Sequence, residues 1–110
     1  MQQTLLVLTN LPDAGTAKAV ARQLVEQRLA ACVNILPGVH SVYRWQGALE
    51  EAAEVTLLVK TVSSGYADLE AAIRNQHPYD VPEIIAMPVA AGLPQYLDWI
   101  AQETNEDVDV

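Results

Sequence analysis

Two long β-strands in the middle of the sequence limit the possible folds more than any other feature. Residues 30–45 and 54–62 both have strand character, and the segment QGALEE at residues 46–51 predicts a turn between them, because Gly47 can adopt a positive φ. At about 3.3 Å per residue, the first strand alone would span on the order of 50 Å. A 100-residue domain has a radius of gyration of only ~13 Å. The hairpin must therefore protrude from the domain or bend sharply.

The first of these strands contains a break and then an apolar face. Pro37 and Gly38 predict a kink or bulge rather than the end of the strand. Beyond the bulge, alternation places Val39, Tyr43 and Trp45 on one face. A protruding hairpin of this kind exposes apolar area and strand edges, which are liabilities for a monomer. We therefore expect a homo-oligomer in which several copies close a ring.

The rest of the sequence predicts two further strands and three helices. Residues 4–8 are apolar without alternation, as in a strand covered on both faces, and residues 82–89 predict another strand. Apolar stripes predict one helix from residue 13 or 16 to about residue 28, another that begins after a serine cap at residue 63 or 64, and a third at Pro94.

The order of these elements is strand, helix, strand, strand, helix, strand, helix. This order predicts an α+β fold of the ferredoxin-like split βαβ type (βαββαβ plus a C-terminal helix). Its four strands would form an antiparallel sheet with both main helices on one face. We expect one domain over residues 1–102 and an acidic tail over residues 103–110.

Charge and composition exclude several classes of partner. The net charge of −8 disfavours nucleic acids and anionic membrane surfaces. The longest apolar runs are too short to cross a bilayer, and the N-terminal MQQT shows no signal peptide, so we expect a cytoplasmic protein. Cys32 is the only cysteine, which excludes an intrachain disulfide and, among apolar neighbours with no nearby cation, predicts a buried, inert thiol.

The segment HPYDVPEI, residues 77–84, is the first candidate site. Its two prolines fix the backbone on either side of Tyr79 and Asp80. His77 could bind a metal together with Asp80, Glu83 or donors from a neighbouring subunit, although HxH, CxxC and HExxH motifs are absent from the sequence. The alternative is that His77 only ends a helix, where its charge suits the helix dipole. His40, on a predicted strand, favours a structural role more strongly.

A small polar cleft is the second candidate site. Lys60 lies near the end of an apolar strand, so its ammonium group needs solvent or an acidic partner, which would be Glu50, Glu51 or Glu83. The candidate residues of this cleft are Trp45, Glu50, Lys60, Tyr79 and Glu83. The alternative is a structural ion pair at a subunit contact.

Motifs that would indicate catalysis are missing. The sequence contains no GxSxG, P-loop or GxGxxG motif, and the segment TNLPDAG lacks the arginine of an acylphosphatase-type anion site. An RNA-recognition domain is disfavoured by the acidic charge and by the absence of phenylalanine. We therefore expect no enzymatic activity and no organic cofactor.

Four segments together resemble the CutA divalent-cation tolerance proteins. They are Arg28–Val55, Leu57–Thr61, HPYDVPEI and YLDWI at Tyr96–Ile100, in this order and spacing. The resemblance covers Leu5 to Ile100. It implies a ferredoxin-like homotrimer, similar in assembly to the PII signalling proteins, in which the long hairpins pair across subunits.

The resemblance also implies a function. Bacterial members of this family are cytoplasmic and are linked to tolerance of copper and other divalent metals. They are not established enzymes. We therefore expect a homotrimeric divalent metal tolerance and response protein that binds divalent cations such as copper. The alternatives are a PII-like sensor of a small ligand or a protein-docking scaffold that uses the cleft between subunits.

Where a copper site is assigned in the family, it uses a cysteine near the end of the first strand and two adjacent histidines before the Pro-Tyr. This chain has Thr9 at the cysteine position and Gln76 at the first histidine position. His77 is therefore the one donor that the resemblance carries over.

Overall fold

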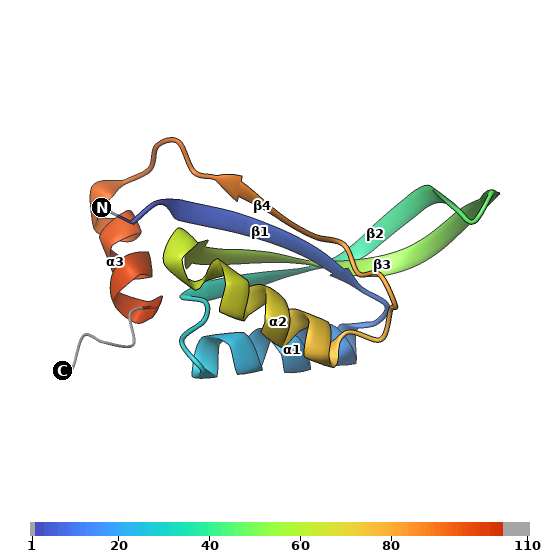
Figure 1. Ribbon diagram of the computed structural model, residues 1–110, viewed down its shortest axis with the longest axis horizontal. Helices are drawn as coiled ribbons and strands as arrows, with labels where there is room; N and C mark the ends of the chain where they lie inside the picture. Colours follow the sequence, from blue (N-terminus) through green and yellow to red (C-terminus); the bar gives the residue numbers. More distant parts are fainter. Residues whose placement is uncertain (1, 105–110) are drawn as a thin grey trace.

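The computed structural model describes residues 2–104, which form a four-stranded antiparallel sheet and three α-helices (Figure 1). The strand order is β2-β3-β1-β4, which confirms the predicted ferredoxin-like α+β fold. The elements are β1 (Thr4–Leu11), α1 (Ala14–Glu26), β2 (Cys32–Trp45), β3 (Ala48–Val62), a 3₁₀ turn (Ser63–Gly65), α2 (Tyr66–Gln76), β4 (Ile84–Pro88) and α3 (Pro94–Thr104).

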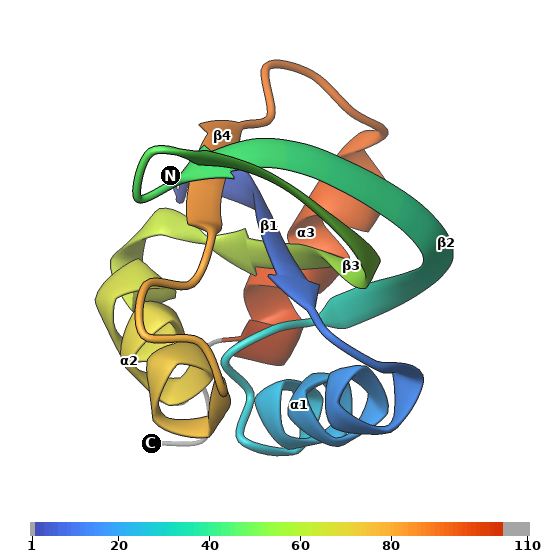
Figure 2. The same cartoon turned by 90° about the vertical axis from the view of Figure 1, so that its right-hand side faces the viewer.

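Helices α1 and α2 cover one face of the sheet, as Figure 2 shows along the length of the molecule. Their apolar stripes meet the alternate residues of β1 and β3 that point toward them. The fully buried members of this core include Val7, Leu11, Leu24, Leu57, Leu69 and Ile73. Burial of each such side chain contributes roughly 1.5–3 kcal/mol to folding. Because these side chains are fully buried in a single chain, this face of the sheet needs no partner to cover it.

A side-chain cap marks the start of α1 but not that of α2. The Asp13 carboxylate accepts a hydrogen bond of 2.7 Å from the Thr16 backbone N–H at the start of α1, and this bond lowers the pKa of Asp13. The predicted serine cap of α2 is wrong, because the N-cap is Gly65 without a side-chain bond. Ser64 instead accepts a hydrogen bond from Gln2, which ties the 3₁₀ turn to the N-terminal segment.

The hairpin of β2 and β3 extends well beyond the helices, and the molecule measures 49 × 26 × 22 Å (Figure 1). The register shifts between Leu36 and Val39, and Gly38 has a φ of +79°, which confirms the predicted bulge. The turn is tighter than predicted. Gln46 and Gly47 both have positive φ and form a two-residue connection, so β3 begins at Ala48 rather than at residue 54.

The other face of the sheet is apolar along β1 and β4. Among residues 2–104 a helix covers it only at one end, where α3 packs on Val62. Cross-strand pairing aligns Leu8 with Ile85 on one side and with Leu58 on the other, and Leu6 with Met87. Leu6, Leu8 and Leu58 are half-buried, and Ile85 is 50% exposed. β1 therefore has the both-faces apolar pattern that its sequence predicts, but only one of these faces is covered along its whole length within the chain.

Helix α3 packs at the end of the sheet opposite the hairpin, where Ile100 contacts Ala31 and Val62 (Figure 1). It includes Glu103 and Thr104, the first two residues of the predicted acidic tail. The other tail residues lie outside the described part of the chain. Within that part, the helices lack the length and hydrophobicity needed to cross a membrane.

Candidate functional site

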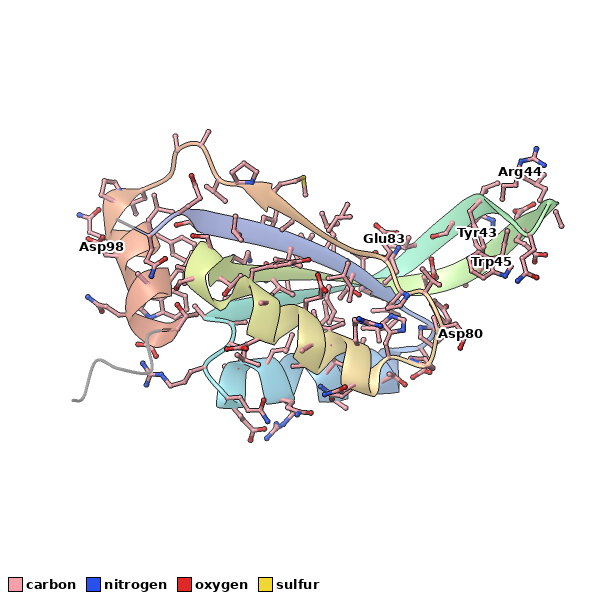
Figure 3. The ribbon with its side chains drawn as sticks, viewed as in Figure 1. Tyr43, Arg44, Trp45, Asp80, Glu83 and Asp98 are labelled. Carbon is pink, nitrogen blue, oxygen red and sulfur yellow. The ribbon has the colours of Figure 1, made fainter. Side chains whose placement is uncertain are left out.

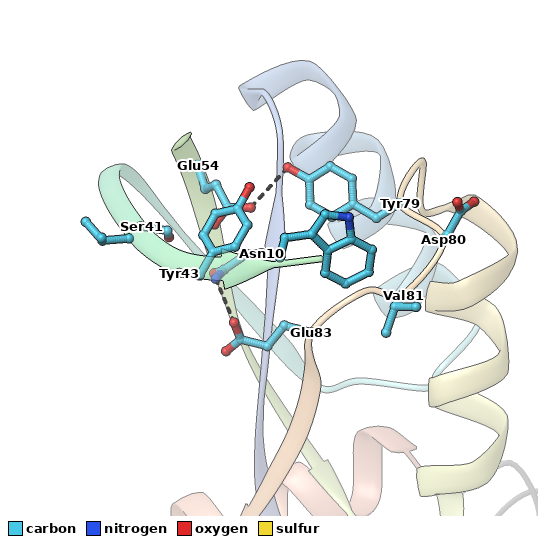
Figure 4. A pocket seen from close by; sticks show the side chains of 10 residues that line it. Asn10, Ser41, Tyr43, Glu54, Tyr79, Asp80, Val81 and Glu83 are labelled. Carbon is cyan, nitrogen blue, oxygen red and sulfur yellow. Dashed lines mark hydrogen bonds between the residues drawn. The ribbon is translucent and has the colours of Figure 1, made fainter. Parts of the chain in front are cut away.

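A cavity of about 580 Å³ lies where the hairpin leaves the sheet and meets the loop between α2 and β4 (Figure 4). Its walls come from β1, from both strands of the hairpin and from this loop. The lining residues are Asn10, Ser41, Val42, Tyr43, Trp45, Glu54, Tyr79, Asp80, Val81 and Glu83. Ligand sites in proteins typically have volumes of about 300–1,000 Å³, so the cavity is large enough for an organic molecule.

A hydrogen bond between the loop and the hairpin fixes one wall of the cavity. The Tyr79 hydroxyl donates to Glu54 Oε2 at 3.0 Å, and the Glu54 side chain is only 8% exposed (Figure 4). Burial, this hydrogen bond and the negative charge of Glu54 raise the pKa of Tyr79 to about 12. The phenol is therefore neutral at physiological pH and remains a donor to the carboxylate.

Asn10, near the end of β1, joins three elements around the cavity. Its side-chain amide donates to Glu83 Oε1 at 3.1 Å, and its side-chain oxygen accepts a hydrogen bond of 2.6 Å from the Thr56 hydroxyl. Its backbone carbonyl oxygen lies 2.6 Å from His77 Nε2. These bonds hold Glu83 at the rim of the cavity and tie His77 to the sheet.

His77 is not among the residues that line the cavity, and it is 9% exposed. Its Nε2 donates to the Asn10 carbonyl, and its Nδ1 accepts a hydrogen bond of 3.2 Å from the Tyr79 backbone N–H. These contacts require the ring proton on Nε2. A metal ion could bind this side chain only by displacing one of the two hydrogen bonds, so the residue has a structural role in the chain as it stands.

The described residues do not form a complete metal site within one chain. Among residues 2–104, His, Cys, Asp and Glu side chains form no group of three or more that could hold a metal ion. His40 lies instead on the exposed hairpin, with Nε2 2.7 Å from Glu51 Oε1. If His77 binds a metal ion, at least some of the other ligands must therefore come from a rearrangement of residues 2–104 or from another copy of the chain.

The structure brings together three of the predicted cleft residues and separates two. Trp45, Tyr79 and Glu83 line the cavity, whereas Glu50 and Lys60 do not. Lys60 lies six positions along β3 from Glu54, which is about 20 Å for a strand.

Lys60 has different partners from those predicted. Its amine donates to Asn34 Oδ1 and lies 3.7 Å from Cys32 Sγ, so the predicted acidic partner is wrong. The strand register explains the difference, because Lys60 pairs directly with Cys32 across β2 and β3. Cys32 is half-buried with this cation beside it, and not fully enclosed by apolar groups.

Sequence reasoning missed Asn10, Tyr43 and Glu54 as parts of this site. The sequence pattern could have identified Asn10 and Glu54 as polar residues with a special role. Each ends an apolar segment of a strand, and the two strands, β1 and β3, pair with each other. Such a residue must find a polar partner when the strand is buried. Tyr43 alternates with Trp45 on the predicted apolar face, but the sequence does not show that the loop after α2 folds over this face.

Comparison with known proteins gives one consistent result. The family model described as CutA1 divalent ion tolerance protein matches residues 5–103. The divalent-cation tolerance protein CutA of Thermus thermophilus is 48% identical over 100 residues, which is 91% of this chain and 97% of that protein. Its solved structure superimposes with a TM-score of 0.91, at 47% identity, over 93% of this chain and 99% of that one.

Two further relatives extend the comparison. A structure of a PII-like protein CutA from Nostoc, in its apo form, superimposes with a TM-score of 0.85 at 40% identity, over 96% of this chain and 98% of the other. A chloroplastic Protein CutA of Arabidopsis thaliana is 39% identical over 102 residues, which is 93% of this chain. The chain spans 56% of the length of that plant relative.

Proposed function

The chain belongs to the CutA1 divalent ion tolerance family, and on this basis we propose that it is a homotrimeric divalent metal tolerance protein of the cytoplasm, which binds divalent cations such as copper. The match of the family model to residues 5–103 is the observation that carries this proposal. The proposal includes no enzymatic activity and no organic cofactor. The compartment is part of the proposal, since the Arabidopsis relative is described as chloroplastic.

The uncovered face of the sheet supports the proposed homotrimer. Leu6, Leu8 and Ile85 form a continuous apolar surface on this face, and both β2 and β4 are edge strands. Burying this surface against other copies would stabilise the assembly by about 25 cal/mol per Å² of apolar area. Three copies around a closed symmetry axis would also cover the strand edges that otherwise invite uncontrolled pairing.

His77 is the donor that we propose for a divalent cation. Its Nε2–H group already donates to a backbone carbonyl, which is how metal-binding histidines are commonly held, and this leaves Nδ1 with a lone pair. The bond from the Tyr79 N–H to Nδ1 would be replaced by the metal. The remaining donors would come from Asp80, Glu83 or a neighbouring subunit.

Copper titration of the intact protein tests this assignment. We expect the His77→Gln variant to bind Cu²⁺ at least about tenfold more weakly than the unmodified protein in calorimetry, which corresponds to about 1.4 kcal/mol. The control is His40→Gln, which removes an exposed histidine from the hairpin and should leave the affinity unchanged. Circular dichroism would confirm that both variants fold. Equal Cu²⁺ affinity of His77→Gln and the unmodified protein would contradict the assignment.

A PII-like sensor of a small organic ligand is the second candidate function. The cavity of about 580 Å³, with aromatic and carboxylate groups from the hairpin and the loop, is the observation that favours it. A bound ligand would raise the melting temperature by mass action, so a thermal-shift screen of metabolites is the test. If none of the metabolites stabilises the assembled protein, the sensor function fails.

A further inference from the structure

The charged residues that line the cavity are all acidic. Three carboxylates line it, those of Glu54, Asp80 and Glu83, and the described lining residues include no Lys, Arg or His. Arg44 precedes Trp45 in β2, but Figure 3 shows its guanidinium directed away from Tyr43 and Trp45, on the other side of the hairpin. The cavity therefore lies in a negative potential, which attracts cations and repels phosphates and carboxylates.

Aromatic rings form the other part of the wall. Tyr43 and Trp45 come from β2 and Tyr79 comes from the loop, and all three are partly exposed. Figure 4 shows the rings of Tyr43 and Tyr79 next to the Glu54 carboxylate. The face of an aromatic ring attracts a cation, and several rings around one space are how proteins recognise alkylated ammonium groups.

The same groups are poorly arranged for a bare metal ion. Glu54 already accepts from the Tyr79 hydroxyl and Glu83 from the Asn10 amide, so the two carboxylates are held at separate places on the wall. The three acids do not converge into a group that could hold a metal ion within residues 2–104. Separate carboxylates, aromatic faces and a volume of about 580 Å³ suit a larger cation that carries carbon.

We propose that this cavity binds an organic cation with an alkylated ammonium head group. The inference rests on the sensor function proposed above and gives it a ligand class. The ammonium carbons contact Tyr43, Trp45 and Tyr79, and the charge is neutralised by Glu54 and Glu83. The hydrogen bonds of these two acids to Tyr79 and Asn10 hold them in place before the ligand arrives, which lowers the entropic cost of binding.

Calorimetry with choline and its neutral isostere 3,3-dimethyl-1-butanol tests this proposal on the full chain in its native assembly. The two probes have the same shape and differ in charge. We expect choline to bind at least about tenfold more tightly than the alcohol, and more weakly at high salt. Glu83→Gln, which keeps an oxygen for Asn10, and Trp45→Leu should each weaken choline binding by about fivefold or more. Glu103→Gln in α3 is the matched charge control and should change nothing.

Three results would overturn the proposal. Equal affinities for choline and the alcohol would exclude recognition of charge, and absence of choline binding at about 10 mM would exclude the ligand class. The Ile85→Lys variant is designed to prevent assembly. If choline binds this variant but not the unmodified protein, a second copy fills the cavity in the assembly. If choline fails but other metabolites raise the melting temperature, the sensor function survives without this ligand class. If nothing binds, both fail.

Discussion

The two faces of the sheet are built from the same four strands but are covered to very different extents. On the helix-covered face, Val7 and Leu57 are fully buried under α1 and α2. On the open face, their strand neighbours Leu6, Leu8 and Leu58 are equally apolar but only half-buried. Ile85 and Met87 on β4 are more exposed still. One face is therefore completed by the chain itself, and the other is left largely open between α3 and the hairpin.

This difference separates the stability of the fold from the stability of an assembly. Substitutions on the covered face should change the free energy of unfolding directly, because they leave a cavity in a packed core. Substitutions on the open face should act mainly through association, because in the proposed homotrimer the lost contacts are with another copy.

The largest effect is expected on the covered face. Leu57→Ala removes a fully buried side chain between α1 and the sheet, and should lower the free energy of unfolding by about 2–5 kcal/mol. Chemical denaturation at a fixed protein concentration measures this loss. A loss below about 1 kcal/mol would mean that the helix-covered core is not closely packed.

The next effect concerns the open face. Ile85→Lys places a charge in the apolar surface, loses roughly 1.5–3 kcal/mol of apolar burial per subunit, and should convert the assembly into monomers. Sedimentation velocity measures the change. Val25→Lys is the matched control, because Val25 is 42% exposed on α1, on the opposite side of the sheet. If both variants sediment like the unmodified protein, the open face is not the interface.

A smaller effect is expected at the junction between the hairpin and the loop. Tyr79→Phe leaves the buried Glu54 carboxylate without its donor and should cost about 1 kcal/mol of stability at neutral pH. The pKa of Tyr79 is raised to about 12, so the contribution of the neutral phenol is complete below its unfolded value of 10.0 and is lost as the pH rises through 12.

Denaturation of this variant between pH 8 and pH 12 is the measurement. The unmodified protein should lose more stability above pH 10 than Tyr79→Phe does. Parallel pH profiles of the two proteins would show that the phenol is not held in its neutral form by the fold.

The smallest expected effect is again on the covered face, and it is a gain in stability rather than a loss. The Thr9 hydroxyl is fully buried and, within residues 2–104, has no hydrogen-bond partner. Thr9→Val keeps the shape of the side chain and removes this group, so it should stabilise the protein by up to about 1 kcal/mol. Differential scanning calorimetry measures the shift in melting temperature. A lower melting temperature would indicate that the hydroxyl is satisfied in solution.

The sequence predicted the elements of this fold because their patterns are local. The break at Pro37-Gly38, the apolar run after Thr4 and the helix capped by Asp13 depend on residues close together in the chain. The errors arose where a distant segment decides the outcome. Ser64 lies in a 3₁₀ turn and bonds to the distant Gln2 instead of capping α2, and Lys60 does not reach the cavity because the register pairs it with Cys32.

The candidate site was predictable only in part for the same reason. Trp45, Tyr79 and Glu83 were identified because their types suit a binding site and because the prolines hold the loop rigid. The contributions of Asn10 and Glu54 depend on how β1, β3 and the loop meet in space, which follows from strand pairing. His77 was proposed as a metal ligand from its type, and the bonds that hold both of its nitrogens become visible only in three dimensions.

The central claim is that an apolar sheet face and a long hairpin, left uncovered by the chain, are covered by other copies of it. Sedimentation equilibrium of the unmodified protein at micromolar concentration tests this claim most directly. We expect a single species of three times the 12.0 kDa chain mass. A folded species with the mass of one chain at the same concentration would contradict it.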